Sequence, residues 1–473
     1  MVIVMSFASL CPGNTLRPRF PALASIGLFI LLVYVVFVHQ GAAAEKGPSR
    51  SSLTLEEAIR TALDKNPRIS ASRFQMDASA AKITQARSGL YPRIDFSESF
   101  MRTNNPALAF STRLNQEQIT MQDFDPARLN DPSSINNFSS VLSLSVPIYD
   151  AGQIRIGVDQ ARLGHESASL SADRVRQEVI TSVIAAYIGV LLAQDQMEVI
   201  RQSIESAKAN RNIIQARVKT GLAVKSDLLR AEVRISELEQ ERLNARSLVE
   251  VSMASLNAAM GISLDEVLHP VPFEQKGLKP PDELEKWVQE ALRNRPDLGE
   301  MRLREITAEQ EVKKAKMAHL PGLFFTSNYE IDSEEYDRTA NNYTLGVVLR
   351  ANLFSGLGLQ AKVREAVATL HQVKAALKQM ELSIGVETRR AYFQAMSSFE
   401  RIQVAEAAVS QAEEGLRIVR NRYESGLFTI VNLLDAELAL QQARTLHLRS
   451  LYDHKLALAQ LNLAAGKTEE GFR

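Results

Sequence analysis

Cysteine is almost absent from the sequence. Cys11 is the single cysteine among 473 residues, and it precedes the first long apolar stretch, where a lipoprotein signal would not place it. An export signal that includes this residue would be removed on maturation. We therefore expect an exported chain without a thiol, a disulfide or a cysteine ligand for a metal.

An excess of charge of one sign is also lacking. The chain has 55 Lys and Arg residues and 55 Asp and Glu residues. Binding of nucleic acid needs a positive field, which such a balance does not give. We therefore expect no nucleic-acid partner.

The motifs of common catalytic sites are missing as well. The sequence has no Gly-x-Ser-x-Gly and no His-Glu-x-x-His arrangement. Gly466-Lys467-Thr468 resembles the end of a phosphate loop, but Leu461 stands where the first glycine is required. We interpret His447 and His454, seven positions apart, as part of a solvated helix face rather than a metal site. We expect no enzyme and no cofactor.

The N-terminus has the pattern of a secretory signal peptide. Two arginines precede the apolar stretch Ala22–Val38, and an Ala42-x-Ala44 cleavage site follows it. This order predicts a signal peptide at residues 1–44 and export of the remainder. An uncleaved membrane anchor is the alternative, because the apolar stretch is near the minimum length of a membrane span.

Proline is absent from two long runs that repeat each other. The first extends from Gln153 to Gly221, and a continuous helix of this length would reach roughly 100 Å. The second, from Gly358 to Gly426, matches it at an offset of 205 positions without gaps. Residues 179–193 are apolar enough to suggest a transmembrane helix. Their copy at 384–396 contains three charged residues, however, so we expect a helix packed against neighbours.

Shorter helices accompany each long run. A second helix, at 226–260 and at 432–465, follows the Gly-Leu turn that ends the run. Another helix begins at Pro67, since proline is favoured at the first helical position. Together these two are about as long as the single helix beside them, which predicts one continuous and one two-piece column in each half. The predicted organisation is a first structural repeat at 45–262, a proline-rich connecting strap at 263–281 and a second repeat at 282–473.

Four stretches alternate between apolar and polar residues, the period of a β-strand. Each has about ten residues, the length that crosses a bilayer when tilted. Four strands cannot close a barrel, and hydrocarbon does not satisfy the polar groups of an open sheet edge, so several chains must share one barrel. Two chains would give a filled interior, whereas three would give twelve strands and room for a lumen. The predicted strands are residues 92–103, 138–149, 321–331 and 342–354.

The first two strands are separated by a long polar segment. Residues 103–137 are rich in Asn, Asp and Pro, the composition of a loop. We expect this segment to lie outside the membrane, where loops of variable length are tolerated.

The duplicated order of these elements resembles the TolC-type outer-membrane efflux proteins across nearly all of the mature chain. Three segments carry the resemblance: Pro147-Ile-Tyr-Asp-Ala-Gly152, Asn352-Leu-Phe-Ser-Gly356 and Tyr423-x-x-Gly426-x-x-Thr429-Ile-Val-Asn-Leu-Leu-Asp-Ala436. The resemblance implies a mainly α fold with a small β part. It also implies a homotrimer with a twelve-stranded barrel in outer-membrane lipid and a twelve-helix periplasmic tunnel. A periplasmic adaptor and an inner-membrane transporter are the implied partners.

The resemblance also implies a gate near the tips of the helical hairpins. In similar proteins acidic residues ring the closed entrance, and Asp435 and Asp227 match such positions, whereas Asn432 stands at another ring position. Phe428 replaces a basic residue of the family's gate network. The tips that would face the adaptor are the turns Gly221-Leu222 and Gly426-Leu427, whose glycines we expect in the left-handed helix cap.

The sequence leaves the cargo open. A passive channel for drug or metal-ion efflux competes with an outlet for type I protein secretion. A periplasmic coiled-coil scaffold without a pore is the alternative of another class, and it explains the four alternating stretches poorly.

Overall fold

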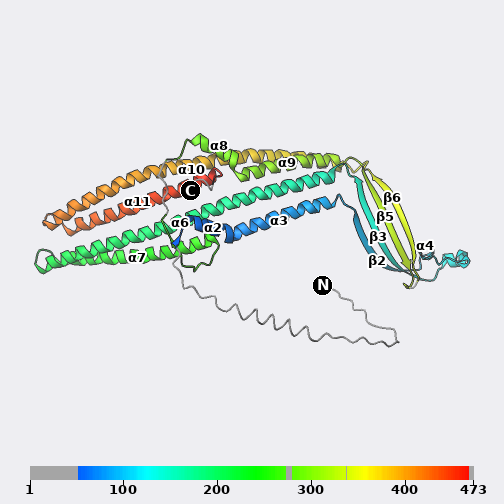
Figure 1. The fold of residues 1–473 in the computed structure, drawn as a ribbon, viewed down its shortest axis with the longest axis horizontal. Helices are drawn as coiled ribbons and strands as arrows, with labels where there is room; N and C mark the ends of the chain where they lie inside the picture. Colours follow the sequence, from blue (N-terminus) through cyan, green and yellow to red (C-terminus); the bar gives the residue numbers. More distant parts are fainter. Residues whose placement is uncertain (1–51, 273–279, 337, 468–473) are drawn as a thin grey trace, which may run out of the picture. The chain divides into compact units, whose positions relative to one another are not determined.

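The computed structural model describes residues 52–272, 280–336 and 338–467. The signal peptide predicted at residues 1–44 lies outside this part of the chain. The described chain is mainly helical, with a small antiparallel sheet (Figure 1). Its principal elements are α2 (Leu55–Lys65), α3 (Pro67–Ser88), β2 (Arg93–Thr103), α4 (Pro106–Asn115), α5 (Pro126–Asn130), β3 (Ile135–Tyr149), α6 (Gln153–Lys219), α7 (Lys225–Met260), α8 (Leu284–Asn294), α9 (Pro296–Met317), β5 (Gly322–Ser333), β6 (Ala340–Arg350), α10 (Gly358–Glu424) and α11 (Ile430–Ala464).

Two uninterrupted helices of 67 residues, α6 and α10, dominate the fold. Each packs against two shorter helices that follow one another along it, α3 and α7 beside α6, and α9 and α11 beside α10 (Figure 1). This arrangement confirms the predicted continuous and two-piece columns. The two halves meet where α6 packs against α9 and α11 and where β3 pairs with β5.

In each two-piece column, α3 with α7 and α9 with α11, the two helices meet end to end at a tight contact. Asn66 caps α3 by accepting a hydrogen bond from the Arg68 amide at 2.8 Å, and its amide group donates to the Ala259 carbonyl near the end of α7 at 2.8 Å. Gly261, at φ +75°, ends α7 against this corner, and a Cβ there would lie 2.6 Å from Cα of Asn66. Gly466, at φ +74°, ends α11 in the same way, against the carbonyl of Asn294. Only glycine fits a left-handed position with a backbone this close.

The main core surrounds the middle of α6. Apolar side chains spaced three and four residues apart, such as Val179, Val183 and Tyr187, are buried against α2, α7 and α11. Among the described residues, α6 is the one helix long and apolar enough to cross a membrane, but half of its apolar window is already buried within the protein. The apolar patch therefore serves packing. The Tyr187 hydroxyl also lies 2.7 Å from the Leu53 carbonyl oxygen and 2.6 Å from that of Val271, which fixes the described part of the strap to this core.

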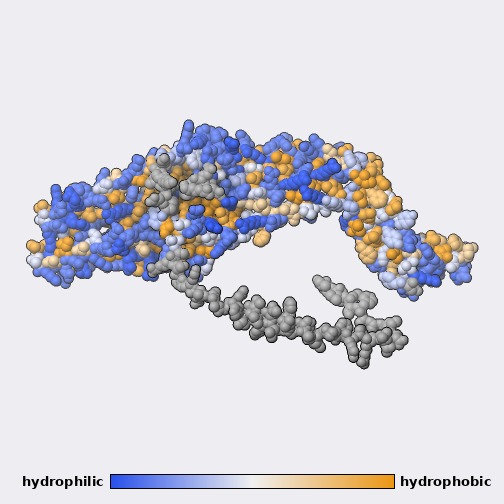
Figure 2. Space-filling model, viewed as in Figure 1, coloured by the Kyte–Doolittle hydropathy of each residue, from blue (hydrophilic) through white to orange (hydrophobic). Residues whose placement is uncertain are grey.

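The sheet is antiparallel, in the order β2-β3-β5-β6. Its strands lie near the predicted positions, but β6 ends at Arg350, whereas the alternation had suggested residue 354. Within the described residues, β2 and β6 each have one unpaired edge. Apolar residues are exposed over the sheet, where Figure 2 shows a hydrophobic surface. They include Ile94, Phe96, Phe100, Leu345, Val347 and Leu349.

The segment between β2 and β3 is not the irregular loop that its composition suggested. It forms α4, a short 3-10 helix at Met121–Phe124, and α5. The side chains of Asn105 and Asp125 accept hydrogen bonds from the first turns of α4 and α5, and each is followed by proline at the first helical position. The same Asn-Pro and Asp-Pro pairs that indicate turns thus start helices here.

The interpretation of His454 as part of a solvated face is wrong. His454 is fully buried, with Nδ1 at 3.1 Å from Ser398 Oγ and its ring against Phe399. It faces α10 within the second helical hairpin, which α10 and α11 form; α6 and α7 form the first. A seven-residue spacing on a helix does not distinguish a buried stripe from an exposed one.

Candidate functional site

The two hairpin tips share one backbone geometry. Gly221 and Gly426 adopt φ +77° and +75°, which confirms the left-handed caps expected from the sequence. The Leu222 amide donates to the Arg217 carbonyl at 2.8 Å, and the Leu427 amide donates to the Arg422 carbonyl at 2.9 Å. This six-to-one bond closes a Schellman motif, which reverses the chain sharply after each long helix.

Apolar side chains are presented to solvent at both turns. Leu222 and Leu427 are 75% and 74% exposed, and Val224 is exposed beside the first of them. One large apolar side chain is thus exposed at each tip, at the residue that follows the capping glycine.

A small core joins the two tips to one another. Its buried members come from all four helices: Ile214, Ala231, Leu416, Tyr423, Ile430 and Leu433. Burial raises the pKa of the Tyr423 hydroxyl, and the negative charge of Asp227 adds to this, while Arg217 opposes it. Tyr423 of the second tip thus packs in one core with Ile214 and Ala231 of the first.

The three predicted gate residues occupy different environments. Asn432 is engaged in a capping box, since its Oδ1 accepts from the Thr429 amide at 3.1 Å and from the Thr429 hydroxyl at 2.8 Å. Asp227 is half-buried in the first turn of α7, where a negative charge favours the helix N-terminus. Asp435 is exposed. Unlike the Asn432 side chain, the Asp435 carboxylate does not take part in the helix cap.

Asp435 lines an open groove between α7 and α11. The groove has a volume of about 540 Å³, and α7 contributes basic, acidic and apolar side chains to its lining. Its lining residues are Ser226, Leu229, Arg230, Val233, Arg234, Glu237, Leu434, Asp435 and Leu438. The described residues contain no group of three or more His, Cys, Asp or Glu side chains arranged to hold a metal ion.

Farther from the tips, a polar cluster that the sequence analysis missed connects the hairpins. Glu437 of α11 accepts hydrogen bonds from Asn210 and from Ser206, at 3.3 Å, on α6. Arg420 lies 3.9 Å from the same carboxylate, and burial raises the pKa of Glu437. A signal existed in the sequence, because Asn210 interrupts the apolar spacing between Ala207 and Ile214, which places a polar group in a packed stripe.

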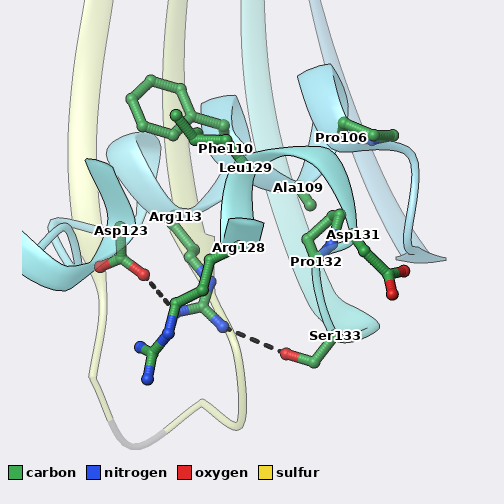
Figure 3. Close-up of a pocket in the computed structure, with 10 residues that line it drawn as sticks. All are labelled: Pro106, Ala109, Phe110, Arg113, Asp123, Arg128, Leu129, Asp131, Pro132 and Ser133. Atoms are coloured by element: carbon green, nitrogen blue, oxygen red, sulfur yellow. Dashed lines mark hydrogen bonds and ion pairs between the residues drawn. The ribbon is translucent and has the colours of Figure 1, made fainter. Parts of the chain in front are cut away.

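The segment between β2 and β3 encloses a second cavity, of about 240 Å³ (Figure 3). Arg113 of α4 crosses it, 3.0 Å from an Asp123 oxygen and 3.5 Å from Ser133 Oγ. The carboxylate thus neutralises the most central cation. These contacts tie α4 to the 3-10 helix and to the segment that follows α5.

Comparison with known proteins agrees with this architecture. The profile of the family described as outer membrane efflux protein matches residues 58–262 and 287–467. The chain is 26% identical to the alkaline protease secretion protein AprF of Pseudomonas aeruginosa over 89% of this chain and 85% of that protein. It is 23% identical to the outer membrane protein TolC of Vibrio cholerae over 88% of this chain and 91% of that protein.

Solved structures match the fold. The outer membrane protein VceC of Vibrio cholerae superposes with a TM-score of 0.73 at 18% identity, over 88% of this chain and 97% of that one. The CmeC outer membrane channel of Campylobacter jejuni gives 0.72 at 19% identity, over 92% and 91%. The chain belongs to the outer membrane efflux protein family, and it is an outer-membrane channel protein of an efflux or secretion system.

Proposed function

We propose that three copies of the chain form one passive conduit, with a twelve-stranded barrel in the outer-membrane lipid and a twelve-helix tube in the periplasm. The hairpin tips form its gate. A periplasmic adaptor docks on the tips, and an inner-membrane transporter supplies the energy.

A repeated surface supports self-association. Within the chain, α6 of the first hairpin packs against α11 of the second. The duplication makes α10 the counterpart of α6, and α7 the counterpart of α11, at an offset of 205. In a closed ring, α10 of one copy would therefore pack against α7 of the next as α6 packs against α11.

The pattern of burial agrees with this symmetry. Apolar residues on one stripe of α10 are exposed, namely Leu382, Val386, Phe393 and Val404, whereas their counterparts on α6, Gln177, Thr181, Ile188 and Val199, are buried or half-buried. The exposed stripe of α7 consists of Leu229, Val233, Leu243, Leu248 and Val251, and its counterparts on α11, Leu434, Leu438, Leu448, Asp453 and Leu456, are half-buried. This is the single observation that carries the proposal, since a stripe that is covered in one repeat and bare in the other fits a second copy of the same surface.

The sheet gives a parallel argument. An unpaired strand edge is not tolerated in hydrocarbon, so β2 of one chain must pair with β6 of the next. Three chains with four strands each give a barrel wide enough for a lumen, whereas two do not.

Assembly is tested by the mass of the detergent-purified protein and its conductance in a planar bilayer. A trimer that conducts ions supports the proposal. The combination L382E/F393E places charges in the α10 stripe and should abolish the trimer, whereas K378E, at an exposed lysine of the same helix, should leave it intact. A water-soluble monomer or dimer without conductance would instead support the periplasmic scaffold.

We infer that Asp435 supplies the negative ring of the gate. Its carboxylate is free to face the axis, while the side chain of Asn432 is held in its cap. Three carboxylates close together attract multivalent cations and repel one another. Block of the wild-type channel by a multivalent cation added at the periplasmic side should weaken in D435N and persist in E250Q, an exposed acid paired with Arg246. Equal block in both variants would remove Asp435 from the gate.

For the cargo, the comparisons favour polypeptides. Relatives named for protease secretion match at 26% and 24% identity over 89% and 90% of this chain. Relatives named for pyoverdine export match at 22% and 20% over 65% and 71%. Deletion of the gene should remove a specific protein from the culture medium and leave sensitivity to small toxic compounds unchanged. The reverse result would assign small-molecule efflux.

A further inference from the structure

Arg217 links the two hairpins of the chain at their tips. It lies in the last turn of α6, and its guanidinium crosses to the end of α10. Nη1 donates to the Tyr423 carbonyl at 2.8 Å, Nη2 donates to the Glu424 carbonyl, and Cζ lies 5.1 Å from the centre of the Tyr423 ring. One side chain thus holds two backbone oxygens and a ring of the other hairpin.

The end of α10 has a structural need for this donor. The last carbonyls of a helix lack intrahelical partners and form the negative end of its dipole. The Gly426 amide donates to the Tyr423 carbonyl at 3.0 Å, but no backbone donor within the described chain reaches the Glu424 carbonyl. Arg217 satisfies this oxygen and places a positive charge at the helix end. A two-pronged contact is directional, so it breaks when α10 shifts relative to α6.

The duplication gives each member of this contact a counterpart. At the offset of 205, Arg422 corresponds to Arg217, and Lys219 corresponds to Glu424. In the single chain, Arg422 remains at its own tip, with Cζ 5.3 Å from the ring centre of Phe428. The Lys219 carbonyl, in the residues that the structure describes, receives no backbone donor. Each single chain therefore presents, at positions equivalent to those of the first contact, an arginine that stacks within its own tip and a carbonyl that receives no backbone donor from the described residues.

We propose that Arg422 donates hydrogen bonds to the last carbonyls of α6 in a neighbouring copy of the chain, as Arg217 does to those of α10 in its own chain. We call each such arginine-carbonyl contact a clasp. This inference rests on the ring assembly proposed above. Around the ring, the clasps alternate between intrachain and interchain contacts and hold the tips closed. The interchain clasp has the hydrogen bonds to carbonyls but no ring contact, because the counterpart of Tyr423 in the first repeat is Val218. The closed state of this chain is then held by arginine-carbonyl contacts, which need no basic residue at position 428.

Conductance of the purified trimer tests the clasps. R217Q and R422Q should each raise the ratio of open to closed channel by about tenfold, the effect of losing hydrogen bonds from a charged donor. R422K, which keeps the charge but loses the two-pronged geometry, should give an intermediate value. R246Q, on an exposed arginine paired with Glu250, should conduct as the wild type does. If R422Q matches R246Q while R217Q opens the channel, the interchain clasp is refuted.

Chemical cross-linking tests the neighbour directly. Cys11 falls in the predicted signal peptide, so the mature chain offers a background free of thiols. A short bismaleimide added to R422C/K219C should give covalent dimers and trimers on a denaturing gel, whereas R246C/K219C should give none. Internally cross-linked monomers from R422C/K219C would overturn the proposal. Failure of the wild-type protein to form a trimer would refute the ring itself, and is seen before any cross-linker is added.

Discussion

Substitution of Gly261 by alanine should destabilise the protein far more than the same substitution at Gly221. Both glycines have nearly the same backbone conformation, φ +75° and +77°. At either position, alanine in this left-handed region costs about 1–2 kcal/mol of stability. Their surroundings differ. At Gly221 a Cβ would meet nothing within 4 Å, whereas at Gly261 it would lie 2.6 Å from Asn66 Cα and 2.8 Å from the Lys65 carbonyl oxygen.

The clash at Gly261 is with backbone, so it can be relieved only by moving α3 away from α7. That movement strains the hydrogen bond from Asn66 to the Ala259 carbonyl. Overpacking of this kind adds about 1–3 kcal/mol, which gives about 2–5 kcal/mol in total for G261A against about 1–2 for G221A. The stabilities of the two variants are compared by guanidinium unfolding of the detergent-purified protein at one protein concentration, with the helical circular dichroism signal as the readout. Equal midpoints for the two variants would refute the idea that the column joint depends on this contact.

Three further substitutions test other contacts. R295A removes a side chain that is 4% exposed and lies 2.7 Å from Asp297, so it should cost about 3–5 kcal/mol in the same unfolding assay, against less than about 1 for R246A on the surface. Y187F removes the hydroxyl donor from the Val271 carbonyl of the strap, while the Leu53 carbonyl keeps the Val271 amide as a donor at 3.0 Å. It should cost about 1–3 kcal/mol, with faster proteolysis of the strap as a second readout. Burial raises the pKa of Glu437, so its ionisation begins to oppose folding as the pH rises above the ordinary glutamate value and does so fully above the raised pKa. E437Q should unfold at higher temperature than the wild type above neutral pH and lose this advantage below pH 4.5, the ordinary value for glutamate. An advantage independent of pH would exclude the carboxyl charge as its cause.

Periodicity and duplication predicted most of the fold. The long helices α6 and α10 were recognisable because they lack proline and end in Gly-Leu turns, and these are local features. The helices α4 and α5 were missed because proline preceded by Asn or Asp starts a helix as readily as it marks a turn. The burial of His454 depends on the helix packed opposite, which a sequence does not display.

The candidate site was predictable in position but not in chemistry. The turns at Gly221 and Gly426 follow from a cap that only glycine adopts easily, so the tips could be placed. The role of Asn432 could not be separated from a gate role, because a capping residue and a ring residue occupy the same first turn. Arg217 gave no signal, since its partners are backbone carbonyls, which every residue has. Residue types alone therefore do not predict contacts between a side chain and backbone carbonyls.

The two repeats also differ where their columns are joined, and this has a physical consequence. In the first repeat the joint is made by a neutral amide, Asn66, which reaches the end of α7. In the second the same corner is occupied by Arg295, which contacts Asp297, Glu387 and, at 3.3 Å, the Ala464 carbonyl at the end of α11. Burial acts to raise the pKa of Asp297, but Arg295 outweighs it and leaves that pKa below its ordinary value. The stability from this pair is thus complete above the ordinary aspartate pKa and is lost as the pH falls through the lowered one. At the first joint the Asn66 amide does not titrate, and the Arg68–Glu178 pair beside it is exposed and so contributes little. Acid should therefore loosen the hairpin of α10 and α11 at its base before that of α6 and α7.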